Sequence, residues 1–211
     1  EGNKYGSEQA RGAGDEGAAA AWTSLLPPFA VHVAMDGTVY TSQVKHAAEQ
    51  YDGTWQPTLL FIPLRLGLDC LNHHYAPAIP ALLALPQSVG MVGGRPRAAH
   101  YFIGTVGDRL LYLDPHTVQP ALRRDAADAA SCHFTAPTIP SMPLLELDPS
   151  LAMGFLLPTQ ASFVQLCDAC AEIFQCVLAP FSIAHEPPDF ARWSQNTEAD
   201  GGEEEDDLVL L

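Results

Sequence analysis

The sequence is poor in basic residues and has no long apolar run. Only 10 lysines and arginines stand against 25 aspartates and glutamates, which gives the chain a formal net charge of −15 at pH 7. Such a chain does not have the basic surface that binds nucleic acid. No apolar run reaches the roughly 18 residues of a membrane-spanning helix, and the first residues do not resemble a secretory signal peptide. We expect a cytoplasmic protein with no nucleic-acid partner and no membrane span.

The usual motifs of nucleotide and metal sites are also missing. The glycine-containing string GGRPR has neither the Walker lysine spacing nor a GxGxxG pattern. Cys167 and Cys170 form a single CxxC inside an expected helix, so a buried helix face is the better interpretation than zinc or redox chemistry. The adjacent His73 and His74 are expected to point in different directions, as surface or capping residues. We expect no cofactor and no metal site.

The sequence contains an odd number of cysteines, 5 in all. They lie in apolar or mixed stretches, which predicts reduced thiols rather than a disulfide framework. None is expected at a helix N-terminus, where the dipole would lower a thiol pKa. Cys70, between an expected strand and helix, is the only positional candidate for a nucleophile, but the charge of Asp69 would raise its pKa. Cys132 is followed by His133, and neighbours along a chain seldom face each other.

Composition divides the chain into three parts. Residues 1–21 are rich in glycine, alanine and charge, without apolar periodicity, and we expect a disordered linker or insert. Residues 22–193 carry the apolar patterns of a folded domain. Residues 194–211 form an expected disordered acidic tail, in which Glu198 to Asp207 hold seven acids and no base.

The apolar patterns within the middle part mix strands and helices without a strict βαβ repeat, which favours the α+β class. A hairpin is predicted at 98–116 with its turn at Gly107-Asp108, and His100 on its first strand is expected to be a satisfied core or edge residue. The other predicted elements are strands at 58–67 and 88–94, a helix at 73–86 in which Pro77 and Pro80 are tolerable only near the first turns, and a helix at 163–175 with Leu166, Cys170 and Phe174 on one stripe.

Two short strings have the character of a site. At the end of the hairpin, Asp114 and His116 flank Pro115, and an extended segment would place both side chains on the same side. An acid beside an imidazole suits an oriented general base, although on spacing alone a surface turn is the commoner interpretation. The string GGRPR at 93–97 is either a plain connector between two strands or a mobile loop over a cleft.

Longer strings carry a resemblance to a known family. In one order, with short gaps, the chain contains FIPLRLGLDCLNHHY, LPQSVGMVGGRPRAAHYFIG, LLYLDPHTVQPAL and ELDPSLAMGFLL. Together they resemble the autophagins, the cytosolic cysteine proteases of autophagy, over roughly residues 55–179. The resemblance implies a papain-like α+β fold. It also implies cleavage of GABARAP-type ubiquitin-like modifiers after a C-terminal glycine, and their release from phosphatidylethanolamine.

The same resemblance assigns roles to individual residues. His116 would activate a catalytic thiol, and Asp114 would hold the tautomer and orientation of its imidazole. Gly93, Gly94 and Pro96 would form the hinge and lid of a regulatory loop that substrate lifts. Leu208 and Leu211 have the spacing of the family's modifier-binding tail motif, with leucine where an aromatic residue is expected. A solubilising acidic tail is the equal alternative.

One expected string is missing. The family's nucleophile lies in a Gly-Trp-Gly-Cys string, whereas Trp22 and Trp55 are followed here by Thr23 and Gln56. The chain therefore resembles the C-terminal portion of a papain-like protease, an incomplete fold without the upstream helical part, and we expect it to be inactive alone. The alternative is a non-catalytic fragment that binds the modifier through its cleft half and tail. A complete enzyme rewired to use Cys70 is the least favoured interpretation.

Overall fold

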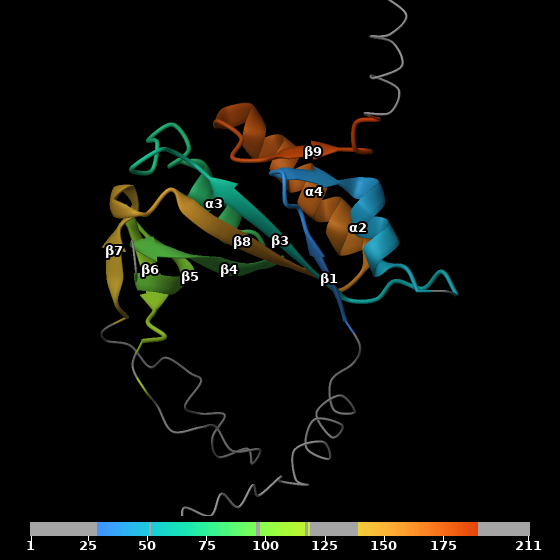
Figure 1. Ribbon diagram of the computed structural model, residues 1–211, viewed down its shortest axis with the longest axis horizontal. Helices are drawn as coiled ribbons and strands as arrows, with labels where there is room; N and C mark the ends of the chain where they lie inside the picture. The colour runs from blue at the N-terminus through green and yellow to red at the C-terminus, as the bar shows by residue number, and fades with distance from the viewer. Residues whose placement is uncertain (1–28, 51, 96–97, 117, 119–138, 190–211) are drawn as a thin grey trace, which may run out of the picture.

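A computed structural model describes residues 29–50, 52–95, 98–116, 118 and 139–189 of the chain. Its centre is a mixed 7-stranded sheet in the order β1-β3-β8-β4-β5-β6-β7 (Figure 1). Only β1 and β3 pair in parallel within this sheet. The strands of the sheet are β1 (Ala30–Val33), β3 (Thr58–Arg65), β4 (Ser88–Arg95), β5 (Ala98–Val106), β6 (Arg109–Leu113), β7 (Ser141–Pro143) and β8 (Ser150–Leu157).

Short elements complete the fold. Strands β2 (Thr38–Tyr40) and β9 (Ser182–Ala184) pair in parallel and form a separate ribbon. The helices are α2 (Thr41–Ala48), α3 (Ala78–Leu83) and α4 (Gln160–Cys176), with a 3₁₀ turn at Leu144–Glu146. The combination of a mixed sheet and separate helices confirms the predicted α+β class.

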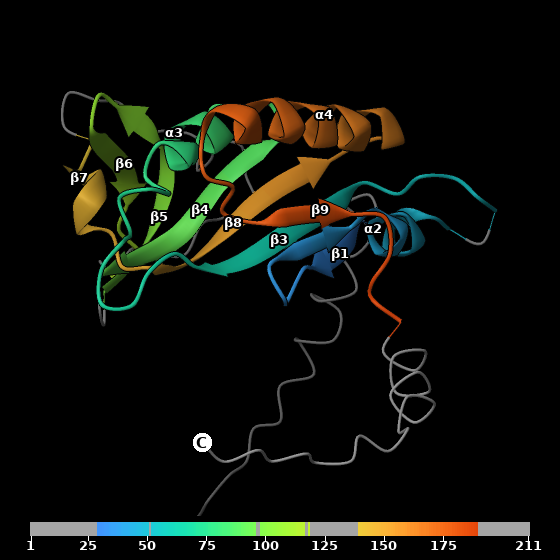
Figure 2. The same cartoon turned by 90° about the horizontal axis from the view of Figure 1, so that it is seen from above.

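Helices α3 and α4 lie along one face of the main sheet (Figure 2). A capping box starts α4: the backbone N–H of Ser162 donates to Thr159 Oγ1 at 3.1 Å, and the Thr159 N–H donates to Ser162 Oγ at the same distance. The helix then buries Phe163, Leu166 and Cys170. Alternation along β3 aims every second side chain at these helices. This covered face includes Leu60, Ile62, Met91, Phe102, Met153, Phe155 and Leu157, all buried.

The opposite face of the sheet is apolar too, but the described residues leave it uncovered. Strand pairing places Val31 beside Leu59 and Leu59 beside Leu156, so these side chains share one face. Val31 is 52% exposed and Leu156 39%. We call this surface the open face, and it comprises Val31, Val33, Leu59, Phe61, Val92, Tyr101, Ala152 and Leu156.

Several predicted elements are confirmed with shifted bounds. The strands expected at 58–67 and 88–94 are β3 and β4, the expected hairpin is β5–β6, and the helix expected at 163–175 is α4. The expected helix at 73–86 is wrong in extent, because α3 begins only at Ala78. Pro80 is tolerated only in the first turn of a helix, which prevents an earlier start. The chain before it is a turn in which the N–H of His74 donates to Asn72 Oδ1 at 3.0 Å.

The expectation for His73 and His74 is wrong, and two other expectations concern residues that the structure does not describe. The rings of His73 and His74 do not point apart: their centroids are 4.0 Å from each other. The tight turn brings the two rings together where a regular helix would separate them. The expected linker at 1–21 and the expected tail at 194–211, with Leu208 and Leu211, lie outside the described residues.

Candidate functional site

Asp114 and His116 face each other at the end of β6. His116 Nδ1 lies 2.6 Å from Asp114 Oδ1, and the backbone N–H of His116 donates to the same oxygen at 2.9 Å. The pairing of the two side chains is as the sequence predicts. The extended backbone is not, because Pro115 and His116 form a turn. An aspartate side chain that accepts from the N–H two residues on stabilises such a turn, and this hydrogen bond outweighs the extended preference before proline.

The pair is accessible to solvent and electrostatically coupled. The side chains of His116 and Asp114 are 51% and 42% exposed. The hydrogen bond from the His116 backbone N–H, followed by that from its ring, lowers the pKa of Asp114. The carboxylate therefore stays ionised down to lower pH than an ordinary aspartate. An ionised carboxylate at Nδ1 holds the proton on that nitrogen and leaves Nε2 free to accept one, as a general base requires.

His100 is the site residue that the sequence does not reveal. Its ring centroid lies 5.8 Å from that of His116 and 4.3 Å from that of Tyr112. It was expected to be satisfied, but its buried Nδ1 has no hydrogen-bond partner among the described residues. Ligand atoms of His100, Asp114 and His116 all lie within 4.8 Å of one another.

A β-bulge produces this cluster. Near the turn, Val106 pairs with Arg109 and Gly104 with Leu111, but the register then shifts so that Phe102 pairs with Tyr112. Continued beyond the last pair, Tyr101 with Leu113, the shifted register sets His100 opposite Asp114. A regular two-residue hairpin would set His100 opposite Pro115 instead. The one signal of the bulge in the sequence is Gly104, an isolated glycine inside the strand, but it does not say which side chains the shifted register aligns, so the sequence alone predicts a core or edge residue at His100.

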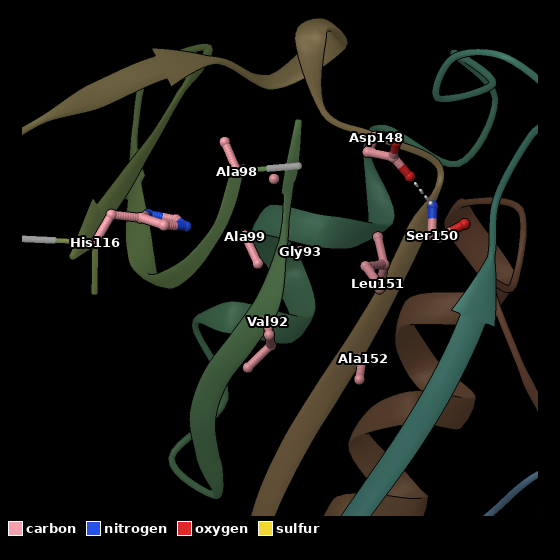
Figure 3. A pocket seen from close by; sticks show the side chains of 10 residues that line it. Val92, Gly93, Ala98, Ala99, His116, Asp148, Ser150, Leu151 and Ala152 are labelled. Carbon is pink, nitrogen blue, oxygen red and sulfur yellow. Dashed lines mark hydrogen bonds between the residues drawn. The ribbon is translucent and has the colours of Figure 1, made fainter. Parts of the chain in front are cut away.

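His116 also forms one wall of a groove of about 590 Å³ on the open face (Figure 3). In Figure 3 its ring points toward Ala99 and the strand of Gly93 across the groove. On the far wall, the N–H of Ser150 donates to Asp148 Oδ1 at 2.8 Å. The lining residues are Val92, Gly93, Gly94, Ala98, Ala99, His116, Asp148, Ser150, Leu151 and Ala152. Most of these lining residues are small, namely glycine, alanine and serine.

Gly93 and Gly94 lie within β4 rather than in a loop, because the strand continues to Arg95 and β5 begins at Ala98. Only residues 96–97 connect the two strands, and Pro96 lies outside the described residues. Gly94 has φ 148°, and a Cβ there would come within 2.3 Å of Ala98 O and 3.1 Å of His100 Nδ1. A glycine at this position therefore keeps both the backbone path and the place of His100.

The described cysteines are free thiols, as predicted, and none of them joins the cluster around His116. Cys70 lies in an exposed loop before α3 and lines a different hollow, with Asp69 and His73. The CxxC pair lies on α4 as the buried-face interpretation expects. Burial raises the pKa of Cys170 to about 12 and that of Cys167 to about 11, so neither thiol is a ready nucleophile. Cys132 lies outside the described residues.

Comparison with known proteins identifies the family. The model of the Peptidase C54 catalytic domain matches residues 13–169. The chain is 36% identical to cysteine protease ATG4B of Gallus gallus over 69% of its own length and 44% of that protein's. It is 34% identical to cysteine protease ATG4A of Bos taurus over 79% of its own length and 48% of that protein's.

A third relative is also a cysteine protease of this kind. The chain is 41% identical to cysteine protease atg4 of Dictyostelium discoideum. The match covers 64% of this chain and 18% of that protein. The chain thus spans less than half the length of these curated relatives. In the described part of the chain, every helix is too short or too polar to cross a membrane. Because the family model matches well over half of the sequence, the chain belongs to the Peptidase C54 family of autophagy-related ATG4 cysteine proteases.

Proposed function

We propose that this chain carries the base and the orienting acid of an ATG4-type cysteine protease. His116 is the base and Asp114 the residue that orients it. The proposed substrates are GABARAP-type ubiquitin-like modifiers, cut after a C-terminal glycine, and their conjugates with phosphatidylethanolamine. The observation that carries the proposal is the 2.6 Å contact between His116 Nδ1 and Asp114 Oδ1 at the wall of an open groove.

The chemistry assigned to the pair is acyl transfer. His116 Nε2 removes the proton of the catalytic thiol, whose sulfur attacks the glycine carbonyl carbon. The imidazolium then protonates the departing amine as the C–N bond breaks, which leaves a thioester. Water adds to the thioester and gives its proton to Nε2, and the thiolate departs from a glycine carboxylate. Asp114 stays ionised throughout and keeps the Nδ1 proton in place.

We propose that the thiol comes from outside the described residues, in a papain-like fold of which this chain is the strand-rich portion. Two findings support this arrangement. The cluster around His116 includes none of the described cysteines. The open face beside His116 is apolar and uncovered by the described residues, and apolar surface of this extent favours a packing partner. The relatives, more than twice as long as the matched region, have room for such a partner segment.

The groove also supports a role for the β4–β5 connection. Gly93 and Gly94 line the groove beside His116, so movement of the two-residue connection that follows would change access to it. We propose that substrate displaces a regulatory segment made of Gly93 and Gly94, at the end of β4, and of Pro96 in the connection that follows. Four free cysteines among the described residues are consistent with a reducing, cytoplasmic setting, which we also propose.

A second candidate function follows from the same absence of a thiol at the described cluster. The chain would then bind the modifier without cutting it, through the groove and through Leu208 and Leu211 of the acidic tail. In this case the tail adds a strand to the modifier and places two leucines in pockets. Leucine fills an aromatic pocket incompletely, so the affinity should be modest.

A cleavage assay with a binding measurement tests what the two functions share, namely that the chain alone does not cut the modifier. The substrate is a GABARAP-type modifier with a C-terminal tag, incubated with the 211-residue chain. We expect no turnover by the chain alone and weaker modifier binding after deletion of Leu208–Leu211. Turnover that Cys70→Ala abolishes would contradict the proposal, because it would place the nucleophile in the exposed loop before α3. The variant Cys176→Ala serves as a matched control, since both thiols are exposed.

A further inference from the structure

The cluster of His100, Asp114 and His116 has a composition that the proteolytic role does not require. It brings together two imidazoles and one carboxylate, whose ligand atoms all lie within 4.8 Å of one another. Proteolysis needs one imidazole and one carboxylate. The second imidazole comes from a different strand, β5, and the bulge near Ile103 aligns it with Asp114.

Two imidazole nitrogens and a carboxylate oxygen are ligands that Zn²⁺ and related divalent ions prefer. Zinc–ligand bonds of about 2.0–2.2 Å in a tetrahedral site set the ligand atoms roughly 3.3 Å apart. The contact of 2.6 Å between His116 and Asp114 is shorter than this, and the upper bound of 4.8 Å for the cluster is longer. Shifts of roughly an ångström would bring all three to coordination distance, and two of the side chains are exposed and can turn.

The state of His100 supports the same conclusion. Its ring is held in place by Tyr112 at 4.3 Å and Phe102 at 6.3 Å between centroids. Its buried Nδ1 has no hydrogen-bond partner among the described residues. A ring nitrogen that makes no hydrogen bond loses none when it binds a metal ion. An imidazole that is held in place and has an unpaired nitrogen is a good first ligand for a site that exposed side chains complete.

We propose that His100, Asp114 and His116 bind a divalent transition-metal ion of the Zn²⁺ class, with water at the remaining position. In this complex the ion takes the place of the proton shared by His116 Nδ1 and Asp114 Oδ1. Ion and proton cannot both occupy that position, so the metal-bound form lacks the hydrogen bond that orients the imidazole. The further consequence, inhibition of proteolysis by the ion, rests on the proposed function. The binding itself does not.

Binding is tested on the chain itself, without an activity assay. Zn²⁺ is titrated at pH 7.5 in competition with a chromophoric chelator, and histidine ring signals are followed by NMR. We expect the first equivalent to shift the rings of His100 and His116. His100→Phe keeps the aromatic packing and removes both nitrogens, and Asp114→Asn keeps the turn-forming oxygen. Each variant should lower the affinity at least about tenfold, since each removes or weakens a ligand.

The matched control is the double variant His73→Gln/His74→Gln. Its two rings also lie close together, 4.0 Å apart, but they belong to the loop before α3. The control should keep the affinity of the unchanged chain. The proposal is overturned if Asp114→Asn binds Zn²⁺ within twofold of the unchanged chain, or if only the His73/His74 control loses binding. Because Asp114 is exposed, its variant decides the matter even where His100→Phe folds poorly. Loss of zinc binding would leave the proteolytic proposal untouched, since cleavage is measured separately.

Discussion

The two faces of the main sheet differ in a way that neighbouring residues of one strand make plain. Leu156 and Leu157 follow each other on β8, yet Leu157 is fully buried while Leu156 is 39% exposed. Helices α3 and α4 cover the side of Leu157, and none of the described residues covers the side of Leu156 to a similar degree. Both faces are nevertheless built from apolar residues, a pattern typical of sheets covered on both sides.

The comparison shows that the core and the candidate site lie on opposite faces of the sheet. The covered face carries the core, whereas the open face carries the groove and ends at His116. A sheet that needed only a core would have polar residues on its second face. The apolar open face therefore supports the proposal that another segment packs there, beside the residues that would act on its thiol.

The largest expected effect is the difference in unfolding free energy between Leu157→Ala and Leu156→Ala. Truncation of the buried leucine should lower the free energy of unfolding by about 2–5 kcal/mol, because it leaves a cavity under α4. Truncation of the exposed one should cost less than about 1 kcal/mol. Urea unfolding followed by tryptophan fluorescence measures both. Equal losses would mean that the open face is covered in the folded chain.

A smaller loss of stability is expected from Gly94→Ala, because Gly94 lines the groove on the open face. The new methyl would come within 2.3 Å of Ala98 O and 3.1 Å of His100 Nδ1, so backbone or ring must move. We expect destabilisation of about 1–3 kcal/mol and shifted NMR signals of His100. Gly104→Ala is the control, because its methyl would meet nothing within 4 Å. An unshifted His100 in Gly94→Ala would contradict the packing described for the cluster.

The open face should also govern association. The chain alone is expected to self-associate through this apolar surface, and Val31→Glu should weaken that association about tenfold, or ~1.4 kcal/mol. Val164→Glu is matched to it, because Val164 is 48% exposed but lies on α4. Sedimentation velocity over a range of concentrations compares the two. If Val164→Glu reduced association as much as Val31→Glu, the open face would not be the contact surface.

The smallest expected effect concerns Cys170 on the covered face. Its pKa is raised to about 12, so the folded state keeps the thiol proton while the unfolded state loses it above pH ~8.5. Folding is therefore less favourable as the pH rises, by on the order of 1 kcal/mol at pH 10. Unfolding curves at pH 8 and pH 10 should show this loss, and Cys170→Ala should reduce it.

Cys176→Ala, at the exposed end of α4, is the control for that pH effect. It should leave the difference between pH 8 and pH 10 as it is in the unchanged chain. A difference that Cys170→Ala does not alter would show that other groups cause the alkaline loss.

Much of the fold could be predicted from local patterns. Short apolar runs and the Gly107-Asp108 turn are sufficient to predict β3, β4 and the β5–β6 hairpin, and a 3.6-residue stripe is sufficient to predict α4. The sequence-based interpretation did not identify β1, β2, β7, β8, β9 or α2. Most of these are short, and β1, β2 and β9 form parallel pairs with distant segments, for which a local pattern carries little information.

The candidate site could be predicted only in part, because one of its three residues joins the others through pairing between two strands. Asp114 and His116 are two residues apart, so their proximity was visible in the sequence, although a turn rather than an extended segment brings them together. His100 joins them only through the shifted register of β5 and β6. A one-residue shift changes which side chains meet, and although Gly104 hints at a bulge, the string from Tyr101 to Leu113 does not give the resulting register.

The most direct test of the central claim is modifier cleavage by the longer protein that we propose contains this chain, with His116→Ala introduced. His73→Ala, in the exposed loop before α3, is the control. The account predicts that His116→Ala abolishes cleavage of a C-terminally tagged GABARAP-type modifier while binding of the modifier persists, and that His73→Ala cleaves normally. Retained turnover by His116→Ala would contradict the account, because it would remove His116 from the mechanism.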